Sequence, residues 1–444
     1  MLNISQKEVE SRLSFDNPWW NSEQATPFTN LSPRDYLPSF YNLLTDLSVK
    51  RAVILLGPRR VGKTVMVHHA IERLLKEGVE PNRVMYLALD TPVYTGFSLE
   101  RLTRSMAEMN RLEPGTTRYI FFDEIQYLKE WERHLKSLVD SYPSYRFIAT
   151  GSAAALRLKS QESGAGRFTD FMLPPLTFGE YIHFIGKEGL VEADPDSEKG
   201  FRQEDPSRFI KSDVIDKVLL RDLPSLYGIS DIQELNSLFA TLAYNTAQEV
   251  EIGKLSQNSG VVANTLARYL EYLEAAFLIK RIRRVDESAK QFKRARGFKV
   301  YLTNPSIRAA LYGPVTADHE AVGALAETAI YAQWIHATAV IERLYFARWK
   351  KGLEVDVVGL DLGQRKADWV VEVKWSDRFF EHPADLKGVL AFAAANRLSR
   401  PPLTITRTCQ GSKRGDGIEL RFVPTSIHCY TIGRNVLRRV VAKF

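Results

Sequence analysis

Short apolar runs separated by amphipathic stretches make up residues 51–180. The runs that are long enough for buried strands lie at residues 52–56, 84–89, 118–122 and 146–150. The stretches between them place apolar residues at helical spacing, for example over 63–77 and 131–140. Strand–helix alternation of this kind predicts an α/β fold, with a parallel sheet covered by helices on both faces.

Other patterns flank this region. An arm rich in Pro, Trp and Phe precedes it and predicts extended chain, leading into a helix near Tyr36–Leu47. A charged segment with scattered Gly and Pro, 185–210, predicts a loop. The predicted division of the chain is 1–35 for the arm, 36–184 for the α/β core, 185–235 for a lid or helical linker, 236–312 for a helix-turn-helix region and 313–444 for a C-terminal α/β domain.

The two later regions have patterns of their own. Residues 236–312 contain a helix, a turn at Asn258–Gly260 and a second helix over Val261–Leu273, which resembles a winged helix-turn-helix. The C-terminal region predicts a helix over 321–336 and strands near 343–348, 353–359 and 369–375.

Composition narrows the class of protein. Of 444 residues, 45% are hydrophobic and 25% are charged, as is usual for a soluble globular protein. Cys409 and Cys429 stand in no CxxC or Cys/His array, which argues against a disulfide scaffold or a structural zinc site. No apolar run approaches the roughly 18 residues of a membrane helix, and the start of the chain lacks a signal-peptide layout. We therefore expect a cytoplasmic protein with no membrane partner.

The segment GPRRVGKT matches the phosphate-loop pattern G-x-x-x-x-G-K-[ST] in full. It follows an apolar strand and opens a helix, which is the context that this pattern requires. The backbone N–H groups of such a loop and the helix N-terminus bind phosphate oxygens, the lysine reaches the β- and γ-phosphates, and the hydroxyl ligates Mg²⁺. The predicted ATP-binding residues are Gly57, Pro58, Arg59, Arg60, Val61, Gly62, Lys63, Thr64 and Val65.

The second half of this site requires an acid at the end of another buried strand. Asp123 and Glu124 follow the aromatic run in RYIFFDEIQ. We expect Asp123 to hold Mg²⁺ and Glu124 to polarise the attacking water. A small-molecule kinase needs no water-activating glutamate, so the adjacent pair favours hydrolysis of ATP. Two surface carboxylates at a strand end are the alternative.

A third strand, in RFIATGSAAAL, ends in Thr150 and Ser152. A polar side chain there can lie between the acid and the γ-phosphate and detect its loss; an ordinary strand-to-helix turn is the alternative. Arg167 follows on a Gly-flanked loop and either reaches the γ-phosphate of a neighbouring subunit or is solvated. His68 and His69 have no metal partner at ligand spacing, which predicts packing or surface roles.

The segments GPRRVGKT, FFDEIQ, ATGS and LPPLTFGEY together resemble those of bacterial and archaeal AAA-type ATPases with a C-terminal domain of unknown function. The resemblance extends over about residues 35–440. It implies an AAA+ core with an ATP site, a winged helix, and then a domain similar to PD-(D/E)XK nucleases. In that family an L-x-P-L-[ST]-F-x-E-Y segment, here Leu173 to Tyr181, ends the core. The aromatic arm and the long loop at 185–210 depart from the pattern.

A nuclease of that class holds Mg²⁺ with clustered acids and places a lysine near the attacking water. Glu327 lies on a predicted helix and Asp356 on a predicted strand. Glu372 and Lys374 share one face of the next strand, because side chains alternate. Asp356 and Glu372 would ligate the metal, with Glu327 as the acid of the first helix, Glu354 able to substitute or assist, and Lys374 positioning or activating the water. Glu354 faces the same side as Asp356. An inactive nuclease-like scaffold and a different fold are the alternatives.

The formal net charge of +7 is unevenly placed. Residues 280–299 hold nine basic and two acidic residues. Their net charge of +7 equals the net charge of the whole chain. This stretch would be the wing, and Asn264, Thr265 and Arg268 would contact DNA from the recognition helix. The alternative is a lid or a protein-docking winged helix with a solvated basic hairpin.

These features predict an ATP- and Mg²⁺-binding AAA+ ATPase that is associated with DNA and able to form a homo-oligomer. The C-terminal domain would cleave a phosphodiester or, alternatively, act as a non-cleaving switch or scaffold that grips protein or nucleic acid.

Overall fold

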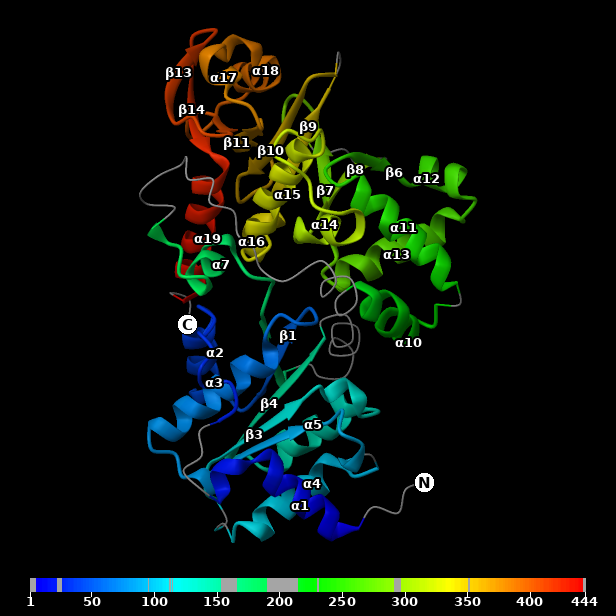
Figure 1. Cartoon of the computed structure of the whole chain (residues 1–444), viewed down its shortest axis with the longest axis vertical. Coiled ribbons are helices and arrows are strands. Elements are labelled where there is room, and N and C mark those ends of the chain that lie inside the picture. The colour runs from blue at the N-terminus through cyan, green and yellow to red at the C-terminus, as the bar shows by residue number, and fades with distance from the viewer. Residues whose placement is uncertain are drawn as a thin grey trace. The chain divides into compact units, whose positions relative to one another are not determined.

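The structure is a computed structural model in which two compact units can be distinguished (Figure 1). The first comprises Met1–Pro175 with Arg439–Phe444, and the second comprises Leu176–Arg438. The residues that the structure describes are 5–21, 26–94, 96–111, 113, 115–152, 166–189, 215–229, 231–290, 297–349 and 352–441. No helix in these ranges has the length and apolar character that crossing a bilayer requires.

The first unit is built on a five-stranded parallel sheet of order β2-β3-β4-β1-β5. Its strands are β1 (Ala52–Gly57), β2 (Val84–Ala88), β3 (Arg118–Asp123), β4 (Tyr145–Ser152) and β5 (Phe168–Met172). Every residue of β1 and β3 is buried, which explains why these strands are continuously apolar in sequence. The four strands that the apolar runs predict are confirmed, and β5 was not predicted.

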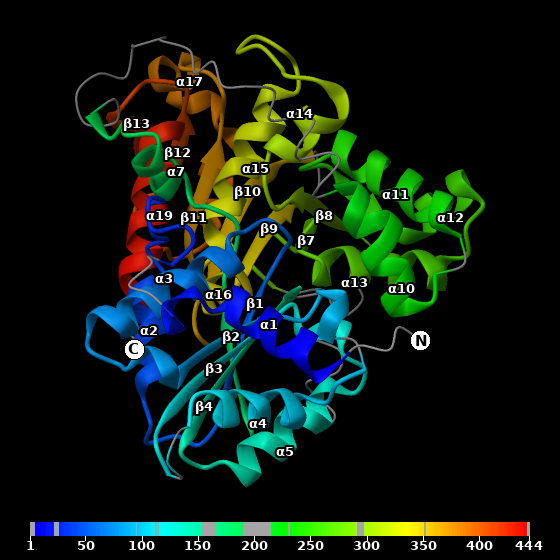
Figure 2. The ribbon, with the colours of Figure 1, turned by 60° about the horizontal axis from the view of Figure 1, so that its bottom comes forward.

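Helices cover this sheet. They are α1 (Gln6–Asp16), α2 (Leu37–Thr45), α3 (Lys63–Lys76), α4 (Leu99–Met109) and α5 (Trp131–Ser141). α2 and α3 pack together against β4, whereas α4 and α5 pack together, with α5 on β4. Figure 2 shows α4 and α5 together at the bottom of the view, on the other side of the strands from α2 and α3. The predicted helices at 36–47, 63–77 and 131–140 are confirmed.

The sequence suggested that the arm is extended chain, and this prediction is wrong. The arm begins with the helix α1. Ser5 and Glu8 form a capping box that starts it, in which each side chain bonds to the backbone of the other residue. Behind α1, the Asn17 side chain accepts from the Tyr86 N–H at 2.6 Å and donates to the Tyr86 carbonyl at 2.9 Å. The arm therefore binds the outer strand β2 as a further strand would, which protects a sheet edge.

The second unit begins with α7 (Phe178–Phe184), which lies in the segment that resembles the end of an ATPase core. Thr177 and Glu180 form a buried capping box around its first turn. The Phe178 N–H donates to Gln333 Oε1 at 2.9 Å, and a Cβ at Gly433 would lie 3.1 Å from Thr177. The LPPLTFGEY segment thus crosses from one unit to the other, and its TFGEY part packs within the second.

A helix, a short strand, two helices and a β-hairpin follow in the second unit. Their bounds are α11 (Ile232–Tyr244), β6 (Glu249–Glu251), α12 (Ile252–Ser259), α13 (Ala263–Ala275), β7 (Ile279–Val285) and β8 (Gly297–Leu302). β8 pairs with both β7 and β6. Gly260 ends α12 with a φ of 73°, which favours glycine. The predicted order of helix, turn and second helix is confirmed by α12 and α13, whereas the winged helix stays a prediction; α10 (Leu223–Tyr227) precedes this region.

The hairpin continues into a nine-stranded sheet of order β13-β14-β12-β11-β10-β9-β7-β8-β6. Its other strands are β9 (Leu344–Arg348), β10 (Glu354–Leu360), β11 (Ala367–Val373), β12 (Leu403–Thr406), β13 (Gly411–Gly415) and β14 (Ile418–Pro424). The helices of this region are α14 (Ser306–Tyr312), α15 (Val322–Trp334), α16 (Thr338–Ile341), α17 (Arg378–Glu381), α18 (Lys387–Ala395) and α19 (Thr425–Val441). The predicted helix and three strands of the C-terminal region are confirmed.

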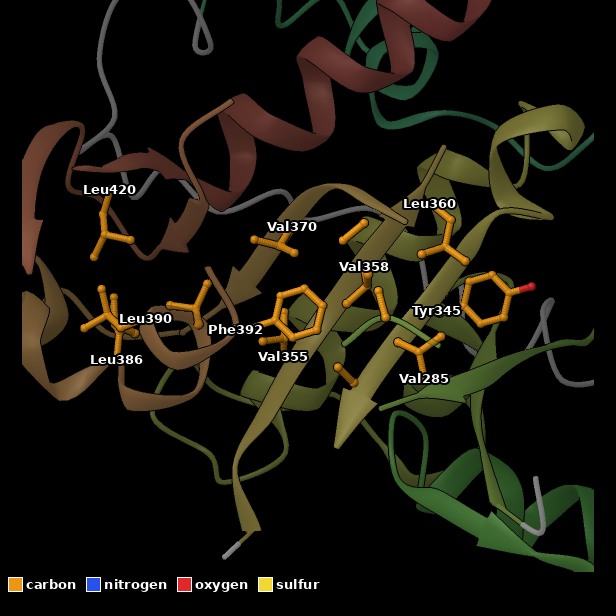
Figure 3. Packing of buried hydrophobic residues seen from close by; sticks show 14 of the residues in the cluster. Val285, Tyr345, Val355, Val358, Leu360, Val370, Leu386, Leu390, Phe392 and Leu420 are labelled. Carbon is orange, nitrogen blue, oxygen red and sulfur yellow. The ribbon is translucent and has the colours of Figure 1, made fainter. Parts of the chain in front are cut away.

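Apolar cores lie on both faces of this sheet. On one face, Val355 and Val358 of β10 pack with Leu390 and Phe392 of α18 (Figure 3). On the other face, Val357 of the same strand packs in a cluster with residues of α15 and α19. A helix layer on each side therefore holds β10 and β11 at the centre, where the predicted acids lie.

Candidate nucleotide site and carboxylate cluster

The phosphate loop joins β1 to α3, as predicted. Arg60 and Gly62 adopt left-handed φ values of 61° and 93°, which turn the loop back to the first residue of the helix. Gly57 is required for a different reason, because a Cβ there would lie 2.4 Å from the Leu173 carbonyl oxygen. The N-terminus of α3 consequently faces the inside of a closed backbone turn, where its N–H groups can bind an anion.

Lys63 and Arg34 brace this loop. The Lys63 ammonium donates to the carbonyls of Gly57 at 3.2 Å and Pro58 at 2.9 Å. The buried Arg34 guanidinium donates to the Val61 carbonyl at 2.8 Å and to the Pro174 carbonyl at 3.1 Å. The sequence analysis did not identify Arg34 as a residue of this site. Its partners are backbone carbonyls, and these interactions leave no recognisable pattern in the sequence.

Asp123 is buried at the end of β3, where it accepts three hydroxyl hydrogen bonds. Thr64 Oγ1 donates at 2.7 Å and Tyr86 OH at 2.8 Å, and the third donor is Thr150. The structure therefore brings together the predicted Mg²⁺ residues Thr64 and Asp123. It adds Tyr86, which the sequence analysis did not select; burial, followed by the charge of Asp123, raises the pKa of this tyrosine.

Glu124 follows with a left-handed φ of 54°. Its N–H donates to Thr150 Oγ1 at 3.1 Å, and its carboxylate contacts the Gln126 side chain. Thr150 thus bonds to the Asp123 carboxylate and to the Glu124 backbone, and its role in detecting the γ-phosphate stays a prediction. Ser152 is also buried, and it pairs in register with Gly57 at the start of the loop.

Strand order explains why these residues meet. β4 lies between β1 and β3, so the carboxyl ends of all three strands share one sheet edge. This is the edge where parallel α/β sheets bind ligands. Thr64 and Asp123 supply hard oxygen donors, which suit an Mg²⁺ ion that takes its remaining ligands from phosphate and water.

Arg167 is placed elsewhere. It donates to Asp140 at 2.5 Å, and both side chains are 44% exposed. Within the described residues the structure shows no contact between Arg167 and the phosphate loop. An action on a neighbouring subunit stays a prediction.

The two histidines of α3 are packing residues, as predicted. The His68 ring packs with those of Trp19, Phe28 and Tyr86, and burial lowers its pKa to about 4. His69 Nε2 lies 3.1 Å from the Phe28 carbonyl. In the described ranges, no group of three or more His, Cys, Asp or Glu side chains has a metal-binding arrangement.

The predicted C-terminal residues also come together, but around a lysine. Lys299 of β8 is 3% exposed. Its ammonium lies 2.8 Å from Glu327, 2.6 Å from Glu354 and 3.5 Å from Asp356. Lys374 lies 2.7 Å from Glu372 and 3.8 Å from Asp356. Glu327, Asp356, Glu372 and Lys374 therefore form one ion cluster with Glu354 and Lys299.

Burial dominates the electrostatics of this cluster. It raises the pKa of Glu327 to about 7 and that of Glu372 to about 8. Burial alone would lower the pKa of Lys299, but the charges of Glu327, Asp356 and Glu354 raise it well above its usual value. Lys299 is thus held as a cation by the carboxylates around it.

The basic stretch is a less open surface than its sequence suggested. Lys280 and Arg281 pair with Glu274, and Arg284 pairs with Glu249. Lys299 was expected to contact phosphates, but it is buried in the ion cluster. Arg283 and Lys290 are exposed, whereas Lys293, Arg294 and Arg296 lie outside the described residues.

The proposed recognition helix α13 is exposed near its start. Asn264 and Arg268 are exposed and Thr265 is partly so, while Leu266 and Leu270 are buried. One face of the helix is therefore available to a partner, and the other packs in the domain.

Comparisons with known proteins agree with the first part of this architecture. Residues 49–182 match the family model of an AAA domain, and residues 198–318 match that of a domain of unknown function. An uncharacterized protein of Haemophilus influenzae is 23% identical over 342 residues, which cover 72% of this chain and 81% of the relative.

Further matches cover smaller parts of their proteins. Two uncharacterized proteins of Methanocaldococcus jannaschii are 26% and 27% identical over 214 and 269 residues. These cover 46% and 53% of this chain, and the matches span about half the length of the two relatives, 45% and 58%. The solved S. cerevisiae Hsp104:casein complex in its extended conformation is 20% identical, with a TM-score of 0.28, over 43% of this chain and 35% of that one. Residues 49–182 are thus similar to an AAA domain of the AAA-type ATPases, and the parallel sheet and the phosphate loop of this region agree with that match.

Proposed function

We propose that the first unit hydrolyses ATP with Mg²⁺. The observation that carries this proposal is the 2.7 Å contact between Thr64 on the phosphate loop and Asp123 on β3. In the proposed reaction Lys63 neutralises the β- and γ-phosphates, Thr64 and Asp123 hold the ion, and Glu124 orients the attacking water. Thr150 links the two acids, so that loss of the γ-phosphate would alter both.

Release of inorganic phosphate from ATP tests this proposal. Lys63→Ala should abolish nucleotide binding, and Glu124→Gln should retain binding while losing most of the hydrolysis. Glu108→Gln, which changes an exposed glutamate of α4, is the matched control. Unchanged ATP affinity in Lys63→Ala would refute the site, and transfer of phosphate to a small molecule would point to a kinase.

We further propose that the segment from α11 to β8 is a winged helix that contacts DNA. The order of its elements and the exposed start of α13 support this proposal. The internal ion pairs of β7 limit the contact to fewer basic residues than the sequence suggested. Arg268→Ala should weaken DNA binding in a fluorescence anisotropy titration and make it less sensitive to salt. Arg101→Ala, an exposed arginine of α4, should have no such effect.

For the C-terminal domain, the position of Lys299 favours the non-cleaving interpretation over an active nuclease. We propose that ATP controls how this domain grips nucleic acid or protein, without cutting it. Supercoiled plasmid incubated with the protein, Mg²⁺ and ATP should stay intact. Cleavage by the wild type that Asp356→Ala abolishes would instead establish a metal-dependent nuclease.

Arg167 could complete the ATP site of a neighbouring copy, and this proposal has its own test. An Arg167→Ala subunit has an intact phosphate loop, and a Lys63→Ala subunit has an intact Arg167. Mixing the two inactive variants should restore ATP hydrolysis if the arginine acts between subunits. No recovery, in a mixture shown to form hetero-oligomers, would refute it.

A further inference from the structure

The carboxylates of the second unit surround a cation that the chain itself supplies, the Lys299 ammonium, and Lys374 contacts Glu372 and Asp356 beside it. Glu327 comes from α15, Glu354 and Asp356 from β10, and Glu372 from β11. Lys299 comes from β8, in a part of the chain that precedes all of them. Its ammonium lies within 3.5 Å of carboxylate oxygens from three of these residues.

Two further groups show that the protein does not satisfy every polar atom at this place. Glu372 is 6% exposed, and its Oε2 atom has no hydrogen-bond partner among the described residues. Thr404 pairs in register with Glu372 on the neighbouring strand, and its fully buried hydroxyl also has no such partner. Buried polar atoms of this kind call for an explanation, and an ion that binds there in another state is one.

We propose that this cluster is a latent divalent-cation site that Lys299 plugs. The ammonium and a metal ion exclude each other. Mg²⁺ requires oxygen ligands at about 2.0–2.1 Å, so an ion bound to Glu327 would have to share that carboxylate with the Lys299 ammonium, which lies 2.8 Å from it. Repulsion between a double and a single positive charge on one carboxylate is severe in a buried site.

The lysine and the acids come from different elements of one nine-stranded sheet and of the helix α15 that covers it. Lys299 lies on the hairpin of the proposed winged helix, opposite Ile282 of β7 and Glu249 of β6. The acids lie on α15, β10 and β11. A partner that shifts the Lys299 side chain would let a metal ion bind to the carboxylates. The position of Lys299 would thus regulate metal binding by this cluster. This inference rests on the proposed non-cleaving role of the cluster and is independent of ATP hydrolysis.

Manganese binding to the nucleotide-free, full-length chain tests the plug, with electron paramagnetic resonance as the readout. The wild type and Asp356→Ala should bind the same amount of Mn²⁺, because the cluster of the wild type holds no metal ion. Lys299→Met should gain one bound Mn²⁺ per chain, with an affinity about a hundredfold or more above that of the wild type. Adding Glu372→Gln to this variant should weaken the new site. Lys290→Met, an exposed lysine of the same basic stretch, is the matched control and should bind as wild type does.

Lys299→Met leaves buried carboxylates without their cation, so a charge-balanced variant, Lys299→Met with Glu354→Gln, accompanies it. If either variant is unfolded by circular dichroism, Mn²⁺ should restore its fold. Asp356-dependent Mn²⁺ binding by wild type would overturn the plug. So would a folded Lys299 variant that binds no Mn²⁺, or unfolded variants that Mn²⁺ does not rescue. If any of these results is obtained and the plasmid still stays intact, the inference about Lys299 is wrong, but the proposed non-cleaving function is not contradicted.

Discussion

The hydroxyl group of Tyr86 connects Asp123, the proposed metal-binding acid, to the neighbouring strand β2. It donates to the same Asp123 oxygen that Thr64 contacts, at 2.8 Å and 2.7 Å respectively. A hydrogen bond of this kind orients a carboxylate for its metal without touching the metal itself. Tyr86 is therefore a positioning residue for the proposed reaction.

Tyr86→Phe should raise the Mg²⁺ concentration that half-saturates ATP hydrolysis by about tenfold, because such supporting bonds affect metal affinity by this order. ATP affinity without Mg²⁺ should be unchanged. Tyr94→Phe is the control, since Tyr94 donates to Asp16 at 2.7 Å in a similar pair away from the site. An equal loss in both variants would mean that Tyr86 acts only through stability.

His68 makes the first unit sensitive to acid. Burial lowers its pKa to about 4, although the charge of Asp123 opposes this. In the unfolded chain the pKa is near 6.5, so the unfolded state binds a proton that the folded state excludes. Its contribution to stability is complete above pH 6.5 and is lost as the pH falls toward 4.

Between pH 7.5 and pH 5 this residue should lower the free energy of unfolding by about 2 kcal/mol. His68→Phe preserves the ring packing and should remove that part of the loss, as measured by urea denaturation at the two pH values. His382→Gln, an exposed histidine, should retain the wild-type pH dependence. An unchanged pH dependence in His68→Phe would contradict the assignment.

At the scale of elements, the N-terminal arm completes the five-stranded sheet. Asn17 bonds to both backbone groups of Tyr86, and the indoles of Trp19 and Trp20 both donate to the Val84 carbonyl. β2 would otherwise expose an open edge, which invites pairing with other chains. The arm also bonds to the Tyr86 backbone and is thereby connected to the proposed ATP site.

Asn17→Leu should destabilise the first unit by about 3 kcal/mol, because it leaves a buried N–H and a buried carbonyl of β2 without partners. Urea denaturation followed by tryptophan fluorescence measures this change. Asn21→Leu replaces an exposed asparagine of the same arm and should change stability little. Equal effects of the two substitutions would show that the strand-like pairing contributes nothing.

Local sequence predicted these elements unevenly. The strands β1 to β4 were predictable because they are buried on both faces and therefore continuously apolar. β5 contains Thr169 and Asp170 and is only partly buried, so its sequence carries no such pattern. The helix α1 has a capping box that could have identified it, but the surrounding prolines and aromatic residues suggested extended chain.

At the scale of the whole molecule, two compact units each contain buried apolar residues of their own. We expect two unfolding transitions in calorimetry. ATP with Mg²⁺ should raise only the transition of the first unit, by about 2.7 kcal/mol when the ligand is at 100 times its dissociation constant. Lys63→Ala should abolish that shift and leave the other transition where it is. A single transition that ATP shifts as a whole would contradict this prediction.

The sequence by itself predicted the match to an AAA domain and the main residues of the proposed ATP site. The phosphate loop is eight consecutive residues between a strand and a helix, and Asp123 ends an apolar run, so local pattern and elementary chemistry suffice. The order helix acid, strand acid and strand Glu-x-Lys likewise predicted the C-terminal cluster, because side-chain alternation is a local property.

Only the tertiary structure decided what fills that cluster and what supports the ATP site. Lys299 is 28 residues from Glu327 along the chain, and nothing in GFKVYL separates a buried lysine from the exposed ones beside it. Tyr86 lies 37 residues from Asp123, and Arg34 lies 140 residues from Pro174. Whether a charged side chain is solvated or paired depends on which distant groups the fold brings to it, because burial and opposite charge set its energy.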